Sequence, residues 1–105
     1  MTAIPPAYLV GLSAVLLGIG LVGILTRRNF ILLLISVEIA MNAAILNFLT
    51  FAAFDRTSEG LNGQAVAVVL VGLAATEVAV GLAIVLALNR LKGSINVAEA
   101  TSLRN

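Results

Sequence analysis

The sequence contains no cysteine and no histidine, and it has few charged residues. Without cysteine or histidine, thiol redox chemistry, haem ligation, iron–sulfur clusters and the usual zinc sites are excluded. Charged residues make up 10% of the chain, whereas a soluble domain has about 25%. Six Lys and Arg against five Asp and Glu give a formal net charge of +1. That balance provides no basic face for nucleic acid and no charge run typical of an interaction tail.

Long apolar stretches fill most of the 105 residues, of which 61% are hydrophobic. A helix needs about 20 apolar residues to cross roughly 30 Å of hydrocarbon. Three stretches meet this requirement: 7–26, 30–54 and 65–88, separated by Arg27–Asn29 and by a polar turn, Asp55–Gln64, and followed by a polar tail, Asn89–Asn105. The sequence therefore predicts an all-α membrane protein with three transmembrane helices, forming a single membrane domain over residues 1–105.

The first stretch is expected to be a retained span rather than a cleaved signal peptide. No positive side chain precedes it, its apolar run is longer than the usual 7–15 residues, and no small-residue cleavage site precedes Arg27. Pro5 and Pro6 suit the start of a helix.

The distribution of Lys and Arg predicts the orientation, because cytoplasmic loops are enriched in these residues. Arg27 and Arg28 lie in the first loop, and Arg90 and Lys92 follow the third span. The opposite side has Arg56, which is offset by neighbouring acids. We therefore expect the N-terminus to face outward and the C-terminus to face the cytoplasm.

Two acids interrupt the apolar spans: Glu38 in the second and Glu77 in the third. An ionisable side chain near the bilayer centre costs at least about 2.5–3.5 kcal/mol on insertion scales, so it indicates a functional site. The alternative is a protonated Glu that joins neighbouring helices by hydrogen bonds. Two acids on different helices favour the functional interpretation.

The two acids are expected at similar depths. Glu38 lies eight residues beyond Phe30, roughly 12 Å from the cytoplasmic end, and Glu77 lies eleven residues before Leu88, roughly 16 Å from it. This count predicts an offset of about one helical turn. If the two faces meet, water could bridge the carboxyls, and such a pair would pass protons within the membrane plane.

Neighbouring residues support a polar site around these acids. Asn42 is four residues after Glu38 and lies on the same helix face, where it can position the carboxyl or a water. Gly81, four residues after Glu77, leaves space for water or for a partner helix. Asn47 is expected to contact a different helix.

Small residues predict close helix contacts. Gly11, Ala14 and Gly18 recur at helical spacing in the first span, and Gly20 and Gly23 form a second close-approach surface. Because three helices cannot shield both acids from lipid, other subunits are expected around this chain.

Several short segments together resemble one family over almost the whole chain: the K subunit (NuoK type) of the proton-pumping NADH:quinone oxidoreductase, respiratory complex I. The similar segments are residues 26–29 (TRRN), 36–39 (SVEI), 41–43 (MNA), 62–64 (NGQ) and, most specifically, 74–83 (AATEVAVGLA). The sequence departs from the family pattern at Thr76, Asn62 and Ala98, and none of these departures touches the two glutamates.

The resemblance implies a role for Glu38 and Glu77 as a proton relay in the central hydrophilic axis of the membrane arm. It also implies that this chain holds no cofactor or metal, because flavin, iron–sulfur clusters and the quinone site belong to partner subunits. Expected partners are the antiporter-like and quinone-end membrane subunits and the lipid bilayer. The expected location is the bacterial inner membrane, since no transit segment is seen.

A second interpretation comes from the same superfamily. Multisubunit cation/proton antiporters and some membrane-bound hydrogenases contain a similar small three-helix subunit. The segment around Glu77 favours complex I. Small multidrug exporters are less similar, because they have four spans and an acid in the first, and the rotor ring of an ATP synthase uses only two helices.

Overall fold

The computed structural model describes residues 4–55, 57–92 and 97, and the helices in this part of the chain follow one another without strands. They are α1 (Pro6–Thr26), α2 (Phe30–Phe54) and α3 (Ser58–Lys92). All three are long and apolar enough to cross a membrane. The predicted fold class, an all-α protein with three membrane-spanning helices, is confirmed.

The ends of α1 and α2 agree with the sequence to within one residue. Pro5 is the N-cap of α1 and Pro6 is its first residue, where the missing proline N–H costs no helical hydrogen bond. Asn29 caps α2: its side-chain oxygen accepts hydrogen bonds from the N–H groups of Ile31 (2.9 Å) and Leu32 (3.4 Å). This cap satisfies two of the backbone donors that a helix start leaves unpaired.

The third helix begins earlier than predicted, which corrects the interpretation of Asp55–Gln64 as a polar turn. Only three residues separate α2 from α3, since α3 begins at Ser58. Thr57 supports this start, because its hydroxyl oxygen accepts a hydrogen bond from the N–H of Glu59 at 3.3 Å. Glu59 in the first turn also complements the helix dipole. The hydrophobic stretch marks the membrane span, whereas the helix continues past it at both ends.

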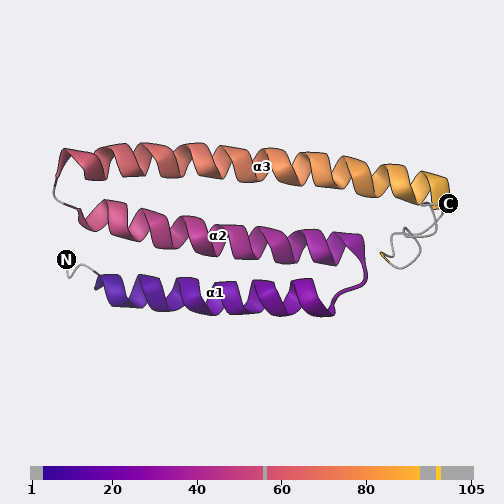
Figure 1. Ribbon diagram of the computed structural model, residues 1–105, viewed down its shortest axis with the longest axis horizontal. Coiled ribbons are helices and arrows are strands. Elements are labelled where there is room, and N and C mark those ends of the chain that lie inside the picture. The colour runs from indigo at the N-terminus through magenta and orange to yellow at the C-terminus, as the bar shows by residue number, and fades with distance from the viewer. Residues whose placement is uncertain (1–3, 56, 93–96, 98–105) are drawn as a thin grey trace.

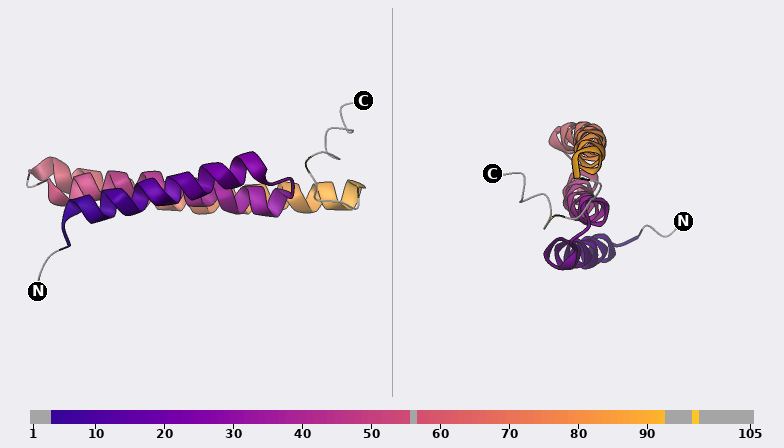
Figure 2. Two further views of the ribbon diagram at one scale, coloured as in Figure 1. Left: turned by 90° about the horizontal axis from the view of Figure 1, so that it is seen from below. Right: turned by 90° about the vertical axis from the view of Figure 1, so that its right-hand side faces the viewer.

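The three helices form a single layer with α2 in the middle (Figures 1 and 2). Consecutive helices are antiparallel, and α2 contacts both α1 and α3. Seen along the helices, α1, α2 and α3 lie in a row (Figure 2, right). The chain therefore presents two broad faces, each of which includes a side of every helix.

Small residues allow the helices to approach closely. The buried apolar side chains are Ala43, Ala52, Ala67, Ala74 and Val85. At the α1–α2 contact, a Cβ at Gly20 would lie 2.8 Å from the backbone nitrogen of Ala40, and one at Gly23 would overlap the side chain of Ser36. The close-approach surface predicted at Gly20 and Gly23 is therefore the contact with α2. By contrast, a Cβ at Gly11 or Gly18 would meet nothing within 4 Å.

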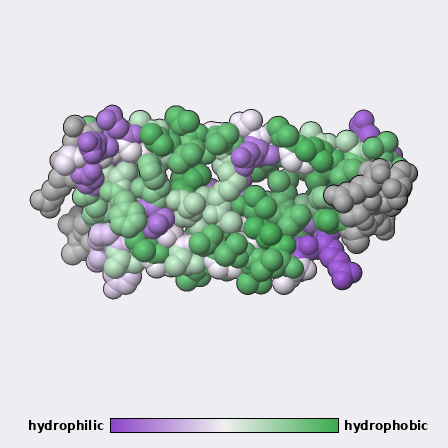
Figure 3. Space-filling model, in the orientation of Figure 1, coloured by the Kyte–Doolittle hydropathy of each residue, from purple (hydrophilic) through white to green (hydrophobic). Residues whose placement is uncertain are grey.

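Large apolar side chains cover the outside of the layer. Leu25 is 83% exposed and Val68 is 72% exposed, which no aqueous surface of this extent would tolerate. Figure 3 shows one broad face that is mostly hydrophobic, with hydrophilic residues gathered at its two ends and a few hydrophilic groups between them. Lipid or other membrane helices must cover both faces.

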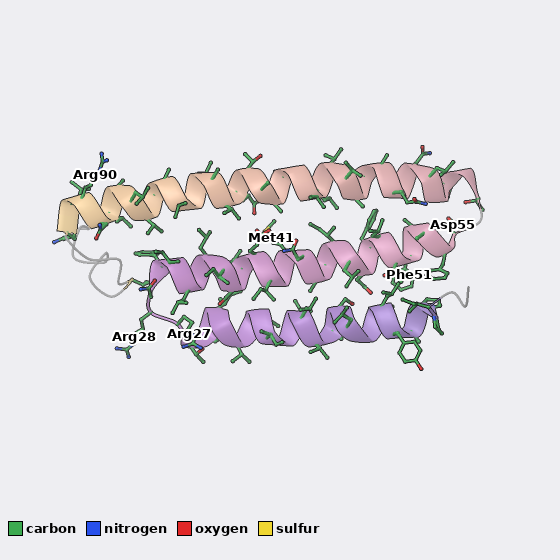
Figure 4. The ribbon with its side chains drawn as sticks, turned by 180° about the vertical axis from the view of Figure 1, so that it is seen from behind. Arg27, Arg28, Met41, Phe51, Asp55 and Arg90 are labelled. Atoms are coloured by element: carbon green, nitrogen blue, oxygen red, sulfur yellow. The ribbon has the colours of Figure 1, made fainter. Side chains whose placement is uncertain are left out.

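The basic residues of the first loop and of the α3 end share one end of the layer. Arg27 and Arg28 lie at that end on the α1 side and Arg90 lies there on the α3 side, whereas Phe51 and Asp55 lie at the other end (Figure 4). The predicted polar tail falls largely outside the described residues beyond Lys92. Val97 is described, and its N–H donates a hydrogen bond to the carbonyl of Arg28 at 2.8 Å.

The turn at Asp55 leads to a pH prediction. The N–H of Thr57 donates to Oδ1 of Asp55 at 2.9 Å, and this bond, with a second one from the Thr57 side chain, lowers the pKa of Asp55. A lowered pKa means that the bond stabilises the turn above the unfolded pKa and is lost as pH falls through the folded pKa. We expect the Thr57 amide to lose protection from hydrogen exchange, relative to its intrinsic rate, on acidification. Asp55→Asn keeps the acceptor but does not titrate, so an identical pH response in that variant would contradict this assignment.

Candidate functional site: two intramembrane glutamates

Glu38 lies about a third of the way along α2, with its side chain half-buried. The side-chain amide of Asn42 donates to Oε1 of Glu38 at 3.3 Å. The two residues are one helical turn apart, so they lie on the same side of α2. The expected contact between Asn42 and the carboxyl is confirmed. Of the two acids, Glu38 is the one whose carboxyl is held by a side-chain hydrogen bond among the described residues.

Glu77 lies midway along α3 and is exposed in the isolated chain. Within the part of the chain that the structure describes, its carboxyl has no hydrogen-bond partner. The neighbouring Thr76 does not provide one, because its hydroxyl donates to the carbonyl of Gly72 at 2.9 Å. A carboxyl so placed in a membrane requires a polar group or water from outside this chain.

The two glutamates stand at the same level of the layer. A Cβ at Gly81 would lie 2.7 Å from Cδ1 of Leu34, and one at Gly63 would lie 2.7 Å from Cβ of Ala52. Leu34 thus lies opposite Gly81, and Ala52 lies opposite Gly63. In an antiparallel pair, moving forward along one helix corresponds to moving backward along the other. Four residues forward from Leu34 on α2 and four backward from Gly81 on α3 lead to Glu38 and Glu77, and the Ala52–Gly63 pair gives the same result over fourteen residues.

The predicted offset of one turn between the acids is therefore wrong. That estimate measured depth from Phe30 and from Leu88, as though both residues stood at the same level. In the structure Phe30 shares a groove with Val85, and α3 continues to Lys92. The end of α3 projects past the start of α2, which removes the offset.

Glu38 and Glu77 nevertheless open to opposite broad faces. On α2, Val37 follows Leu34 by three residues and Glu38 follows it by four, which rotates their side chains about the helix axis by about −60° and +40° relative to Leu34. Val37 and Glu38 therefore point to opposite sides of Leu34. On α3, Glu77 precedes Gly81 by four residues and Ile84 follows it by three, so the same helix geometry places Glu77 and Ile84 on one side of Gly81. Val37 and Ile84 line one groove, so Glu77 lies on the face of Val37, and Glu38 lies on the other face.

This arrangement determines whether a water molecule can bridge the two carboxyls. The sequence allowed a water bridge only if the two helix faces meet, and within this chain they do not. Any proton route between the two carboxyls within this chain must therefore cross the α2–α3 contact. Each carboxyl also opens to a different face of the layer.

Gly81 brings α2 close to α3. Its missing side chain makes room for Leu34, so the space expected beside Glu77 is occupied by a neighbouring helix rather than left for water. The sequence left open whether water or a partner helix would fill this space, and the structure shows that α2 fills it.

A polar contact between side chains also joins α1 to α2. The hydroxyl of Ser13 donates to the carbonyl of Val10 at 2.8 Å and lies 3.3 Å from the side-chain oxygen of Asn47. The prediction that Asn47 contacts a different helix is confirmed. Ser13 was not predicted, because serine is common in membrane helices and only the packing identifies its partner.

Neither acid belongs to a metal site among the described residues. No group of three or more His, Cys, Asp or Glu side chains that could hold a metal ion occurs there. The chemistry available at Glu38 and Glu77 is proton binding and hydrogen bonding.

Fold and site together define a small membrane-spanning protein with one acid on each face of a single helix layer. Residues 8–105 match the family described as NADH-ubiquinone/plastoquinone oxidoreductase chain 4L. The chain is 50% identical over 99 residues to NADH-quinone oxidoreductase subunit K of Anaeromyxobacter sp. (strain K), covering 94% of this chain and 97% of that protein. The chain belongs to this subunit K, or chain 4L, family.

Two further relatives are similar over nearly their whole length. NADH-quinone oxidoreductase subunit K 1 of Syntrophobacter fumaroxidans is 50% identical, with 92% of this chain and 93% of that protein covered. Subunit K of Deinococcus radiodurans is 42% identical, with 96% and 95% covered. These names do not favour the alternative of an antiporter or hydrogenase subunit.

Proposed function

We propose that this chain carries protons laterally through the membrane arm of NADH-quinone oxidoreductase, with Glu38 and Glu77 as the proton-carrying groups. One observation supports this proposal above the others: the two acids stand at one level on adjacent helices and open to opposite faces of a layer one helix thick. A proton received from a subunit on one face then has only the α2–α3 contact to cross before it leaves on the other.

The surrounding residues have supporting roles in this proposal. Asn42 orients the Glu38 carboxyl through its amide donor, and Gly81 allows α2 and α3 to approach. In this proposal a proton moves between the two carboxyls when a neighbouring subunit changes the field around them.

Redox chemistry is assigned to other subunits. We assign flavin, iron–sulfur clusters and quinone to partner subunits, so that this chain is a non-redox part of the translocase. The absence of cysteine and histidine from the sequence agrees with assigning the iron–sulfur clusters elsewhere. We place it in the bacterial inner membrane, as the bacterial relatives suggest, between a quinone-end subunit and an antiporter-like subunit. Proton pumping by the assembled complex with Gln at both positions tests the proposal, and normal pumping would contradict it.

The orientation proposed from the Lys and Arg distribution places the Arg27 end in the cytoplasm. The chain has no cysteine, so a single introduced cysteine is a unique label in this subunit. We expect Glu59→Cys to react with an impermeant thiol reagent from outside the cell, and Asn89→Cys to react only after the membrane is opened. The opposite labelling pattern would reverse the orientation.

A further inference from the structure

A groove between α1 and α2 runs along the face that carries Glu38. It has a volume of about 510 Å³ and extends from Arg27 to Val15 on α1 and along Ile35 and Ile39 on α2. Gly18 lines the groove and leaves it open, since a Cβ at Gly18 would meet nothing within 4 Å. We call this feature the α1–α2 groove.

The wall of the α1–α2 groove offers almost no free polar group. Its two hydroxyls are already used by their own helices: Thr26 donates to the carbonyl of Val22 at 2.7 Å, and Ser36 donates to the carbonyl of Leu32 at 2.8 Å. The remaining lining is apolar except at Arg27. A ligand that fits this chemistry is apolar along its length and negatively charged at one end.

The length of the groove distinguishes a lipid tail from a protein helix. Arg27 lies twelve positions after Val15, which corresponds to roughly 18 Å of helix. This is close to half of the hydrocarbon thickness of about 30 Å, and Val15 lies near the middle of α1. The groove thus spans one leaflet, as a single acyl chain does, whereas a transmembrane helix would require a groove through both leaflets.

We propose that the α1–α2 groove binds an acyl chain of an anionic phospholipid, whose phosphate pairs with Arg27 and Arg28. Arg27 lines the end of the groove, Arg28 follows it in the loop, and both side chains are exposed at the end of the layer (Figure 4). Arginine binds phosphate through paired hydrogen bonds, and basic pockets at this depth bind anionic headgroups. This inference is independent of the proton-carrying role of Glu38.

Photolabelling of the intact complex tests the proposal. The complex is reconstituted in phosphatidylcholine nanodiscs containing a small fraction of either phosphatidylglycerol or phosphatidylcholine with a photoactivatable group in the acyl chain. We expect phosphatidylglycerol to label α1 and α2 peptides of the groove several-fold more than phosphatidylcholine. In Arg27→Gln/Arg28→Gln, which changes only the loop, this preference should disappear.

Two matched variants test the groove itself. Gly18→Leu fills it, so labelling by both lipids should fall several-fold, whereas Gly11→Leu, which is also open but does not line the groove, should label as the wild type. If Gly18→Leu does not assemble, the double Arg variant still decides the outcome. Equal labelling by the two lipids in the wild type would overturn the proposal, as would crosslinking of a photoreactive residue at Gly18 to a protein subunit instead of lipid.

Discussion

Replacing Glu38 by Gln is expected to yield an assembled complex that has lost most of its quinone-coupled proton pumping. The substitution keeps the volume and an acceptor for the Asn42 amide, so α2 should still pack. It removes the only group at that position that can carry a proton. Proton uptake or release in proteoliposomes measures the effect, and NADH oxidation with an artificial electron acceptor should survive, because that reaction does not use the membrane arm.

Two related variants sharpen this prediction. Glu77→Gln should act in the same direction but more mildly, because Glu77 has no hydrogen-bond partner among the described residues and is less committed to one geometry. Glu38→Asp shortens the side chain by one methylene and should retain part of the pumping if water completes the path.

The double Gln variant provides the clearest outcome. If it assembles and pumps normally, the two acids only hold helices together, and the relay is excluded. Loss of assembly in the double variant, with pumping per assembled complex unchanged in each single variant, would lead to the same conclusion.

Substituting Ala for Gly20 is expected to weaken assembly severely. The new Cβ would lie 2.8 Å from the Ala40 nitrogen and 2.9 Å from the Ser36 carbonyl oxygen. These are backbone atoms of a helix, so they cannot move aside as a side chain does, and α1 must shift as a whole. Overpacking of this kind typically costs about 1–3 kcal/mol. The yield of complex on native gels and its dissociation temperature measure the loss.

Gly11→Ala is the matched control for this prediction. It makes the same chemical change in the same helix, but its Cβ would meet nothing within 4 Å. Because Ala favours a helix over Gly by up to about 1 kcal/mol, Gly11→Ala should be neutral or slightly stabilising. If the two variants lose assembly to the same extent, close approach at Gly20 is not the cause.

The sequence predicted the helices better than it predicted their ends. The bounds of α1 and α2 follow from charge, proline and asparagine at their ends, and these signals are local. The start of α3 was placed at Ala65 instead of Ser58, because hydropathy reports where a chain meets lipid and not where its backbone hydrogen bonds begin.

The contact between Glu38 and Asn42 was predictable because one helix fixes it. The level and the facing of Glu38 relative to Glu77 depend on how two helices pack, and here that packing is set by Gly81 against Leu34 and Gly63 against Ala52. Neither pair is distinguishable in the sequence from many other small and large apolar neighbours. The spacing of each acid within its own span therefore could not reveal the shared level or the opposite faces.

A layer one helix thick has no interior large enough to enclose a carboxyl side chain, although it buries the small hydroxyls of Ser13, Ser36 and Thr50. The side chains buried within it are small, and Glu38, Asn42 and Glu77 all reach its surface. A newly inserted copy that has not met its neighbours thus presents carboxyls to the acyl chains on both sides, at a cost of at least about 2.5 kcal/mol for each charged group. We therefore expect the orphan subunit to be short-lived, so that its abundance follows that of the subunits that cover it.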